Sequence, residues 1–209
     1  MSEQTRFFLP PLPYEADALF PAYGTGALCT HHDRIFAAHV DALNILLDGY
    51  RALQGKSVYE LLYSSKLPRV DAEAIKWHCG AVFAHTLYFR SMSAPSGGYP
   101  IPGGRLAEKM RQSIGSYAEF CYRFREAALS VSGVGFLYLV FDKRSKTVRL
   151  LPCRNYDVPG GWCTALLCMD LWEHAYFSDY AEDRAAAVDA FLSVVNWREV
   201  EHNLSKDQK

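Results

Sequence analysis

Four side chains in the sequence could together bind one metal ion. His31 lies near the start of one long helical pattern, and His85 lies late in a second one. Asp170 and His174 are four residues apart, where a strand-like segment gives way to a helical one, so both can point to one place. Three imidazole nitrogens and one carboxylate oxygen suit manganese, iron or zinc. Spacing alone does not specify such a site, because a histidine taken singly is more often a core or surface residue.

The elements that must position these side chains begin with two long helices. Thr30 is a residue type that caps helices, and residues 31–53 after it carry apolar side chains at helical spacing. Asp71 heads a second long helical pattern over residues 72–92. Two long helices with a modest connection between them predict an antiparallel hairpin. In such a hairpin the start of the first helix lies beside the end of the second, which brings the two histidines together.

The second half of the chain has a different character. A stretch rich in proline and glycine, residues 94–104, is the best linker candidate. Beyond it the sequence predicts two helices, at about 105–113 and 115–130. Three short strands of an antiparallel sheet follow, at 134–142, 147–153 and 162–170. The end is helical again, at 173–180, at 183–195 and from Asn196 onward. The predicted fold class is therefore α+β. An extended opening and a helical hairpin are followed by a part of the chain that mixes helices with a three-stranded antiparallel sheet.

The composition limits the classes of function. Half of the 209 residues are apolar and the net charge is −1, which gives no reason to expect nucleic acid or an anionic membrane as a partner. No apolar run approaches the roughly 20 residues that a membrane span requires. The first residues lack the basic and apolar segments of a secretory signal. The six cysteines are scattered without a CxxC pair, which indicates reduced thiols. We expect a cytoplasmic protein.

The segments around the candidate ligands resemble one known family. DLWEHAY, at residues 170–176, resembles the DxWEHxY signature of the iron/manganese superoxide dismutases. Four further segments match the family in the same order, and these are FFLPPLPYEADAL at 7–19, the pair His31-His32, HTLYF at 85–89 and VVNW at 194–197. The resemblance therefore covers nearly the whole chain.

The resemblance implies a homodimeric superoxide dismutase with one iron or manganese ion per subunit. It also implies an N-terminal strap and helical hairpin domain at residues 1–95 and a C-terminal α/β domain with a three-stranded antiparallel sheet at residues 96–209, with the metal between the two. Mapped residue by residue, its ligands would be His31, His85, Asp170 and His174. In the implied cycle one superoxide loses an electron and becomes dioxygen. A second superoxide then gains an electron and two protons and becomes hydrogen peroxide.

Three charged residues acquire roles from the same resemblance. Arg184 and Arg34 fall where the family places cations that attract the anionic substrate. Glu173 matches a glutamate that reaches across the dimer to the ligand histidine of the other subunit. Loss of that carboxylate should therefore weaken both the dimer and metal binding.

Several positions near the ligands differ from the family pattern. The tyrosine expected eight residues after the first ligand is His39, and the glutamine that donates to metal-bound solvent is replaced at its two alternative places by Ala81 and Tyr156. We expect a hydrogen bond between Tyr156 and His39 to replace the family's tyrosine–glutamine bond. Because an imidazole titrates nearer neutral pH than a phenol, we expect the activity to vary between pH 6 and 8.

Further replacements affect the pocket walls and the dimer contact. The wall tryptophans of the family are replaced by Phe89, Phe136 and Tyr138. A histidine–tyrosine pair that bridges the two subunits is replaced by Ile35 and Phe177, so both partners have become apolar together and neither leaves a buried donor unpaired.

Two other functions remain open on the sequence. The first is another metalloenzyme on the same scaffold that acts on a different small oxidant, as the His39 and Tyr156 pair suggests. The second is a catalytically silent homologue in which the metal only stabilises the fold. The presence of all the ligand types disfavours the second. The sequence does not choose between iron and manganese, and it assigns no role to His32, His78 or His202.

Overall fold

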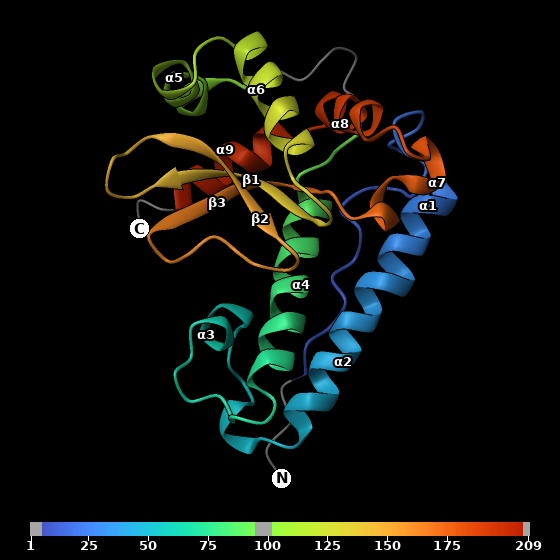
Figure 1. Ribbon diagram of the computed structural model, residues 1–209, viewed down its shortest axis with the longest axis vertical. Coiled ribbons are helices and arrows are strands. Elements are labelled where there is room, and N and C mark those ends of the chain that lie inside the picture. Colours follow the sequence, from blue (N-terminus) through green and yellow to red (C-terminus); the bar gives the residue numbers. More distant parts are fainter. Residues whose placement is uncertain (1–5, 95–101, 207–209) are drawn as a thin grey trace.

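The first half of the chain is built on two long helices that lie antiparallel and side by side (Figure 1). The computed structural model describes residues 6–94 and 102–206. In this half the elements follow in the order α1 (Thr25–Thr30), a π-helical segment (His31–Phe36), α2 (Ala37–Asp48), a 3-10 turn (Arg51–Leu53), α3 (Val58–Leu62) and α4 (Ala72–Arg90). The first three form one continuous helix that packs along α4, so the predicted hairpin is confirmed.

Apolar side chains at helical spacing explain why the hairpin forms. The buried positions along the two helices include Val40, Leu43 and Leu47 on α2 and Ile75, Cys79 and Val82 on α4. Burial of a large aliphatic side chain contributes roughly 1.5–3 kcal/mol. None of the described helices combines the length and the apolar composition that a membrane crossing requires.

The start of the first helix differs from the prediction. Thr30, expected as the N-cap, has helical dihedral angles (φ −61°, ψ −44°) and its side chain caps nothing. The helix begins at Thr25, after the extended residue Gly24. Leu28 is buried in the core, so packing of this extra turn outweighs the poor helix propensity of Gly26. A turn that depends on tertiary packing leaves no propensity signal, and the sequence therefore places the start too late.

The second half combines helices with a small sheet. Its elements are α5 (Gly104–Ser113), α6 (Tyr117–Leu129), β1 (Gly135–Asp142), β2 (Val148–Arg154), β3 (Cys163–Asp170), a 3-10 turn (Glu173–Ala175), α7 (Phe177–Tyr180), α8 (Arg184–Ser193) and α9 (Trp197–Lys206). The strands form an antiparallel sheet in the order β2-β1-β3, which confirms the α+β class. Helices α5 and α6 lie above the sheet in Figure 1, while α4 and α9 contact β3. Most of the predicted linker, residues 95–101, lies outside the described residues.

Ser91, directly after α4, ties the helical hairpin to the sheet. Its hydroxyl oxygen accepts a hydrogen bond from the backbone N–H of Cys168 on β3 at 3.1 Å. Its carbonyl oxygen accepts from the N–H of Asn196, between α8 and α9, at 2.7 Å. Met92 then forms a β-bridge with Val195. These contacts hold the end of α4 against β3 and so bring His85 and Asp170 close together.

Candidate metal centre

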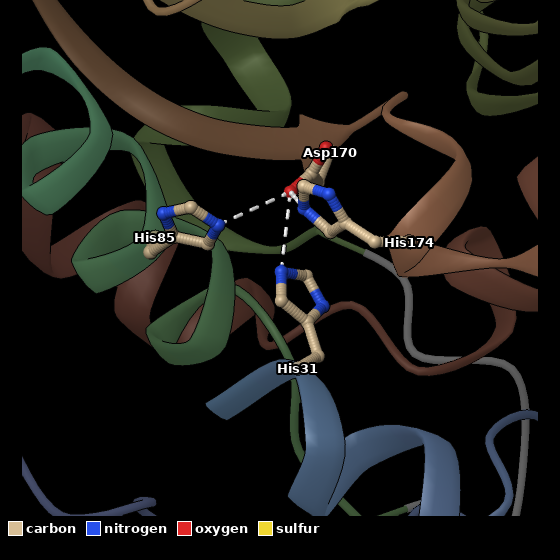
Figure 2. Close-up of side chains that lie close together, drawn as sticks. All are labelled: His31, His85, Asp170 and His174. Atoms are coloured by element: carbon tan, nitrogen blue, oxygen red, sulfur yellow. Dashed lines mark ion pairs between the residues drawn. The ribbon is translucent and has the colours of Figure 1, made fainter. Parts of the chain in front are cut away.

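The four predicted ligands converge on one point, as Figure 2 shows. One carboxylate oxygen of Asp170, Oδ2, lies 3.3 Å from Nε2 of His31 and 3.6 Å from Nε2 of His85. The same oxygen lies 3.3 Å from Nε2 of His174. All four candidate ligand atoms lie within 4.8 Å of one another. The site is therefore of the type with three histidines and one aspartate, and it takes one metal ion.

Each ligand comes from a different element. His31 opens the π-helical segment, where an extra residue in the turn widens the helix, and such segments are frequent at functional sites. His85 lies in the last third of α4. Asp170 is the final residue of β3, and His174 lies in the 3-10 turn that follows. Both halves of the chain thus contribute to one cluster.

The donor atoms fit a cation because no described group satisfies them. Nε2 of each of the three histidines and Oδ2 of Asp170 are buried and lack a hydrogen-bond partner in the described part of the chain. A buried polar atom without a partner costs roughly 1–3 kcal/mol. An ion in the middle would satisfy all four atoms together. Imidazole nitrogen with carboxylate oxygen is a donor set that suits iron, manganese and zinc.

Hydrogen bonds on the far side of two ligands aim them at the centre. Nδ1 of His85 donates to the carbonyl oxygen of Ala81, one helical turn earlier, at 2.8 Å. This bond leaves Nε2 of His85 bare and directed toward the cluster. Oδ1 of Asp170 accepts from the backbone N–H of Trp172 at 2.8 Å, so Oδ2 is the oxygen that faces the histidines.

The electrostatics of the cluster favour neutral imidazoles on His31 and His85 beside an ionised carboxylate. Burial, and after it the neighbouring His31, lower the pKa of His85 to about 3. Burial likewise lowers the pKa of His31. For Asp170 burial alone would raise the pKa, but the nearby imidazoles of His174 and His31 outweigh it and hold the pKa below its ordinary value. Neutral imidazole and ionised carboxylate are the forms that bind metal.

The hydrogen bond expected between Tyr156 and His39 is present. Nε2 of His39 lies 3.0 Å from the hydroxyl oxygen of Tyr156. Nδ1 of His39 lies 3.0 Å from Nδ1 of His78, a contact that the sequence did not predict. Burial and the neighbouring His78 lower the pKa of His39 to about 4, so the titration of this ring does not account for the activity change that we expect between pH 6 and 8.

Aromatic rings fix Tyr156 beside the cluster. Trp172 stacks on the Tyr156 ring at 4.7 Å between centroids and an interplanar angle of 15°, and Trp77 meets the same ring edge-on at 4.9 Å. The Tyr156 ring lies 5.9 Å from that of His85. Trp172 also stacks on His174 at 5.6 Å. The tryptophan within the DLWEHAY segment therefore packs both a ligand and its neighbouring phenol, a role that the sequence analysis did not assign.

The remaining candidate residues do not lie among the ligand atoms. The Arg184 guanidinium donates to the carbonyl oxygens of Val131 and Gly133, each at 2.8 Å, and more weakly to that of Leu171 at 3.3 Å. These bonds connect the start of α8 to the loop before β1 and to the end of β3. Glu173 is exposed on the 3-10 turn, and Arg34 is exposed on the π-helical segment.

The structure gives contacts to His32 and His78, two residues to which the sequence assigned no role. His32 is buried, with Nε2 at 2.8 Å from the carbonyl oxygen of Pro10 and Nδ1 at 2.7 Å from the Asp33 carboxylate, so it ties the strap to the first helix. His78 extends the contact between His39 and Tyr156. No spacing signal in the sequence marks His78, because its partner lies on another helix.

Comparison with protein families gives two matches that together span most of the chain. The alpha-hairpin domain of the iron/manganese superoxide dismutases matches residues 6–93. The C-terminal domain of the same enzymes matches residues 102–203.

Individual relatives are similar over nearly their whole length. The chain is 35% identical to "Superoxide dismutase [Fe]" of Legionella pneumophila, over 95% of this chain and 98% of the relative. It is 34% identical to the protein of the same name from Escherichia coli K12, with the same coverage. It is 32% identical to "Superoxide dismutase [Mn/Fe]" of Rickettsia bellii, over 96% of this chain and 94% of the relative. With its site of three histidines and one aspartate, the chain belongs to the iron/manganese superoxide dismutase family.

Proposed function

We propose that this protein dismutates superoxide to dioxygen and hydrogen peroxide with one iron or manganese ion held by His31, His85, Asp170 and His174. The observation that carries the proposal is the set of four buried donor atoms without partners, all within 4.8 Å of one another. When bound, the ion would supply the alternating one-electron oxidation and reduction of superoxide. The residues of the chain hold the ligand geometry, bind the anion and supply protons.

In this proposal Tyr156 takes the place of the glutamine that the family uses beside the metal-bound solvent. Two observations support it: the phenol is buried against His85, and its hydroxyl hydrogen-bonds to His39. Burial raises the pKa of Tyr156, and the nearby Asp170 raises it further, so the phenol stays protonated at neutral pH. A protonated phenol is a donor that can point either to His39 or toward the centre.

Arg184 would add positive charge near the path of the superoxide anion. Its guanidinium lies beside the Tyr176 ring, 5.7 Å from the ring centroid, and it donates to three carbonyl oxygens. Because carbonyl oxygens neutralise no charge, the cation keeps its attraction for an anion while its position is fixed.

We also propose that the protein is a homodimer in which Glu173 reaches the ligand histidine of the second copy. Glu173 is exposed next to His174, whose side chain is 20% exposed. Phe177, in the following helix α7, is 57% exposed, and burial of such a ring favours association. The two proposed domains are residues 1–95 and 96–209, and the family matches at 6–93 and 102–203 support this division. The proposed compartment is the cytoplasm.

The test is superoxide consumption per bound metal ion, measured on protein loaded separately with iron and with manganese. Fast turnover with either ion supports the proposal and identifies the cofactor. The variant Asp170→Asn should lose turnover, whereas Asp41→Asn, an exposed position on α2, should keep it. Full occupancy with negligible turnover for both ions contradicts dismutation, and the centre would then act on another small oxidant or only stabilise the fold.

A further inference from the structure

His78 is the outer end of a hydrogen-bonded chain of three side chains that leads to the metal centre. Its Nδ1 lies 3.0 Å from Nδ1 of His39, and Nε2 of His39 lies 3.0 Å from the hydroxyl of Tyr156. His78 and His39 are partly exposed, on α4 and α2, whereas Tyr156 is only 6% exposed and lies against His85. The chain therefore runs from the solvent boundary to the wall of the centre.

The directions of the two hydrogen bonds depend on each other. A neutral imidazole has one N–H and one bare nitrogen. If His78 donates from Nδ1, then His39 is bare at Nδ1, carries its proton on Nε2 and donates to the Tyr156 oxygen. The hydroxyl hydrogen of Tyr156 is then free for a partner on the metal side. If His39 instead donates to His78, its Nε2 is bare and accepts the hydroxyl hydrogen of Tyr156, which turns away from the centre.

The contact between the two rings itself requires this coupling. At 3.0 Å two N–H groups would repel each other, so one of the two Nδ1 atoms is bare and accepts from the N–H of the other. The three side chains thus have two neutral arrangements that differ only in where the protons lie. We propose that His78 is a positioning residue that sets the direction of this chain and links it to water, so that one proton passes from solvent through His39 and Tyr156 to the peroxide product.

One passage along the chain balances in protons and moves no electron. Tyr156 gives its hydroxyl proton to the peroxide and receives the Nε2 proton of His39. His39 receives the Nδ1 proton of His78 at its own Nδ1, and His78 takes a proton from water at Nε2, which leaves hydroxide in the solvent. The three side chains begin and end neutral. The starting arrangement returns when the two partly exposed rings exchange their N–H protons with water.

The inference rests on the proposed function, because dismutation is what consumes the protons. If His78 had a purely structural role, replacing it in a protein that still folds would not change which nitrogen of His39 carries the proton. The position of that proton is therefore the quantity that separates the two roles, and it can be measured without turnover.

The first measurement is nitrogen-15 NMR of the His39 ring in protein loaded with zinc, which is diamagnetic. In the wild type both ring nitrogens should show shifts averaged between the two tautomers. In His78→Phe, His39 should show one tautomer only, because its Nδ1 loses the partner that can either donate or accept. In His78→Gln both tautomers can persist, since a glutamine amide donates through its NH2 group or accepts through its oxygen, but the amide cannot pass a proton on. His202→Gln, at an exposed position on α9, is the matched control and should leave the His39 shifts unchanged.

The second measurement is turnover of the iron- or manganese-loaded enzyme. His78→Gln should lower kcat at saturating superoxide by about 10²-fold, a usual contribution of proton transfer, and leave kcat/KM unchanged. Added imidazole should restore much of the kcat of His78→Phe. Identical His39 shifts in the wild type and in His78→Phe would overturn the inference. A wild type that consumes no superoxide defeats the proposed function and proton delivery with it, while the NMR shifts still decide whether His78 directs the chain.

Discussion

Gly80 on α4 packs directly against the backbone carbonyl of Tyr156. A Cβ atom placed on Gly80 would lie 2.1 Å from that carbonyl oxygen, far inside van der Waals contact. The obstacle is backbone rather than a flexible side chain, so it cannot rotate out of the way. The glycine in this helix therefore sets how closely the loop that carries Tyr156 approaches the metal ligands.

Replacing Gly80 with alanine should push Tyr156 away from His39. We expect the variant to lose the hydrogen bond between these residues and to lose about 1–3 kcal/mol of stability, as is usual for overpacking. Chemical shifts of the Tyr156 ring and urea unfolding measure the two effects. Gly26→Ala is the matched control, since nothing lies within 4 Å of its Cβ position in α1, and it should be neutral or slightly stabilising. Equal behaviour of the two variants would show that the close approach does not position Tyr156.

Metal removal should destabilise the protein strongly. A metal present at about 1,000 times its dissociation constant adds about 4 kcal/mol to the free energy of unfolding. We expect manganese to raise the midpoint of thermal unfolding of metal-free protein, and Asp170→Asn to lose most of that increase. Asp41→Asn should keep the full increase. If the Asp170 variant responds to manganese like the wild type, the cluster is not the binding site.

Acid should weaken the metal-free fold at pH values where carboxylates are still ionised. The pKa of His85 is about 3 and that of His39 about 4 in the folded state, whereas both are near 6.5 when unfolded. The unfolded chain therefore binds more protons between these values, and the free energy of unfolding falls as the pH drops from about 6.5 toward 4. His85 contributes up to about 1.4 kcal/mol per pH unit, and the partly exposed His39 contributes less because water screens it.

Urea unfolding of metal-free protein at several pH values measures this dependence. The lowered pKa of Asp170 affects stability only at lower pH. Its contribution to the free energy of unfolding is lost as the pH falls below about 3.8. His39→Phe should show a shallower fall between pH 6.5 and 4 than the wild type. A midpoint that stays constant across this range would mean that the imidazoles titrate normally in the fold.

Loss of the Glu173 carboxylate should weaken the proposed dimer together with metal retention. Glu173→Ala should sediment with a larger monomer fraction at low protein concentration and should release its metal to a chelator faster, because His174 loses the partner that orients it. Glu182→Ala, an exposed position nearby in the chain, is the control and should behave as wild type. A tight and fully metallated Glu173→Ala dimer would refute the bridge.

The ligands and the fold class could be predicted from the sequence, whereas the surroundings of the ligands could be predicted only in part. Asp170 and His174 stand in a short signature, so local spacing suffices to find them. The bond between His39 and Tyr156 could be expected because both occupy positions with known partners in the family. His78 could not, because its contact depends on how α2 and α4 face each other. The close approach at Gly80 is likewise a tertiary fact that no local pattern records.

The distribution of the ligands over both halves has a consequence for biosynthesis. A growing chain that has not reached His174 carries at most three of the four ligands, and the sheet that holds Asp170 forms late. A complete binding site therefore exists only once nearly the whole chain has left the ribosome. Binding of the ion thus belongs to the final stage of folding.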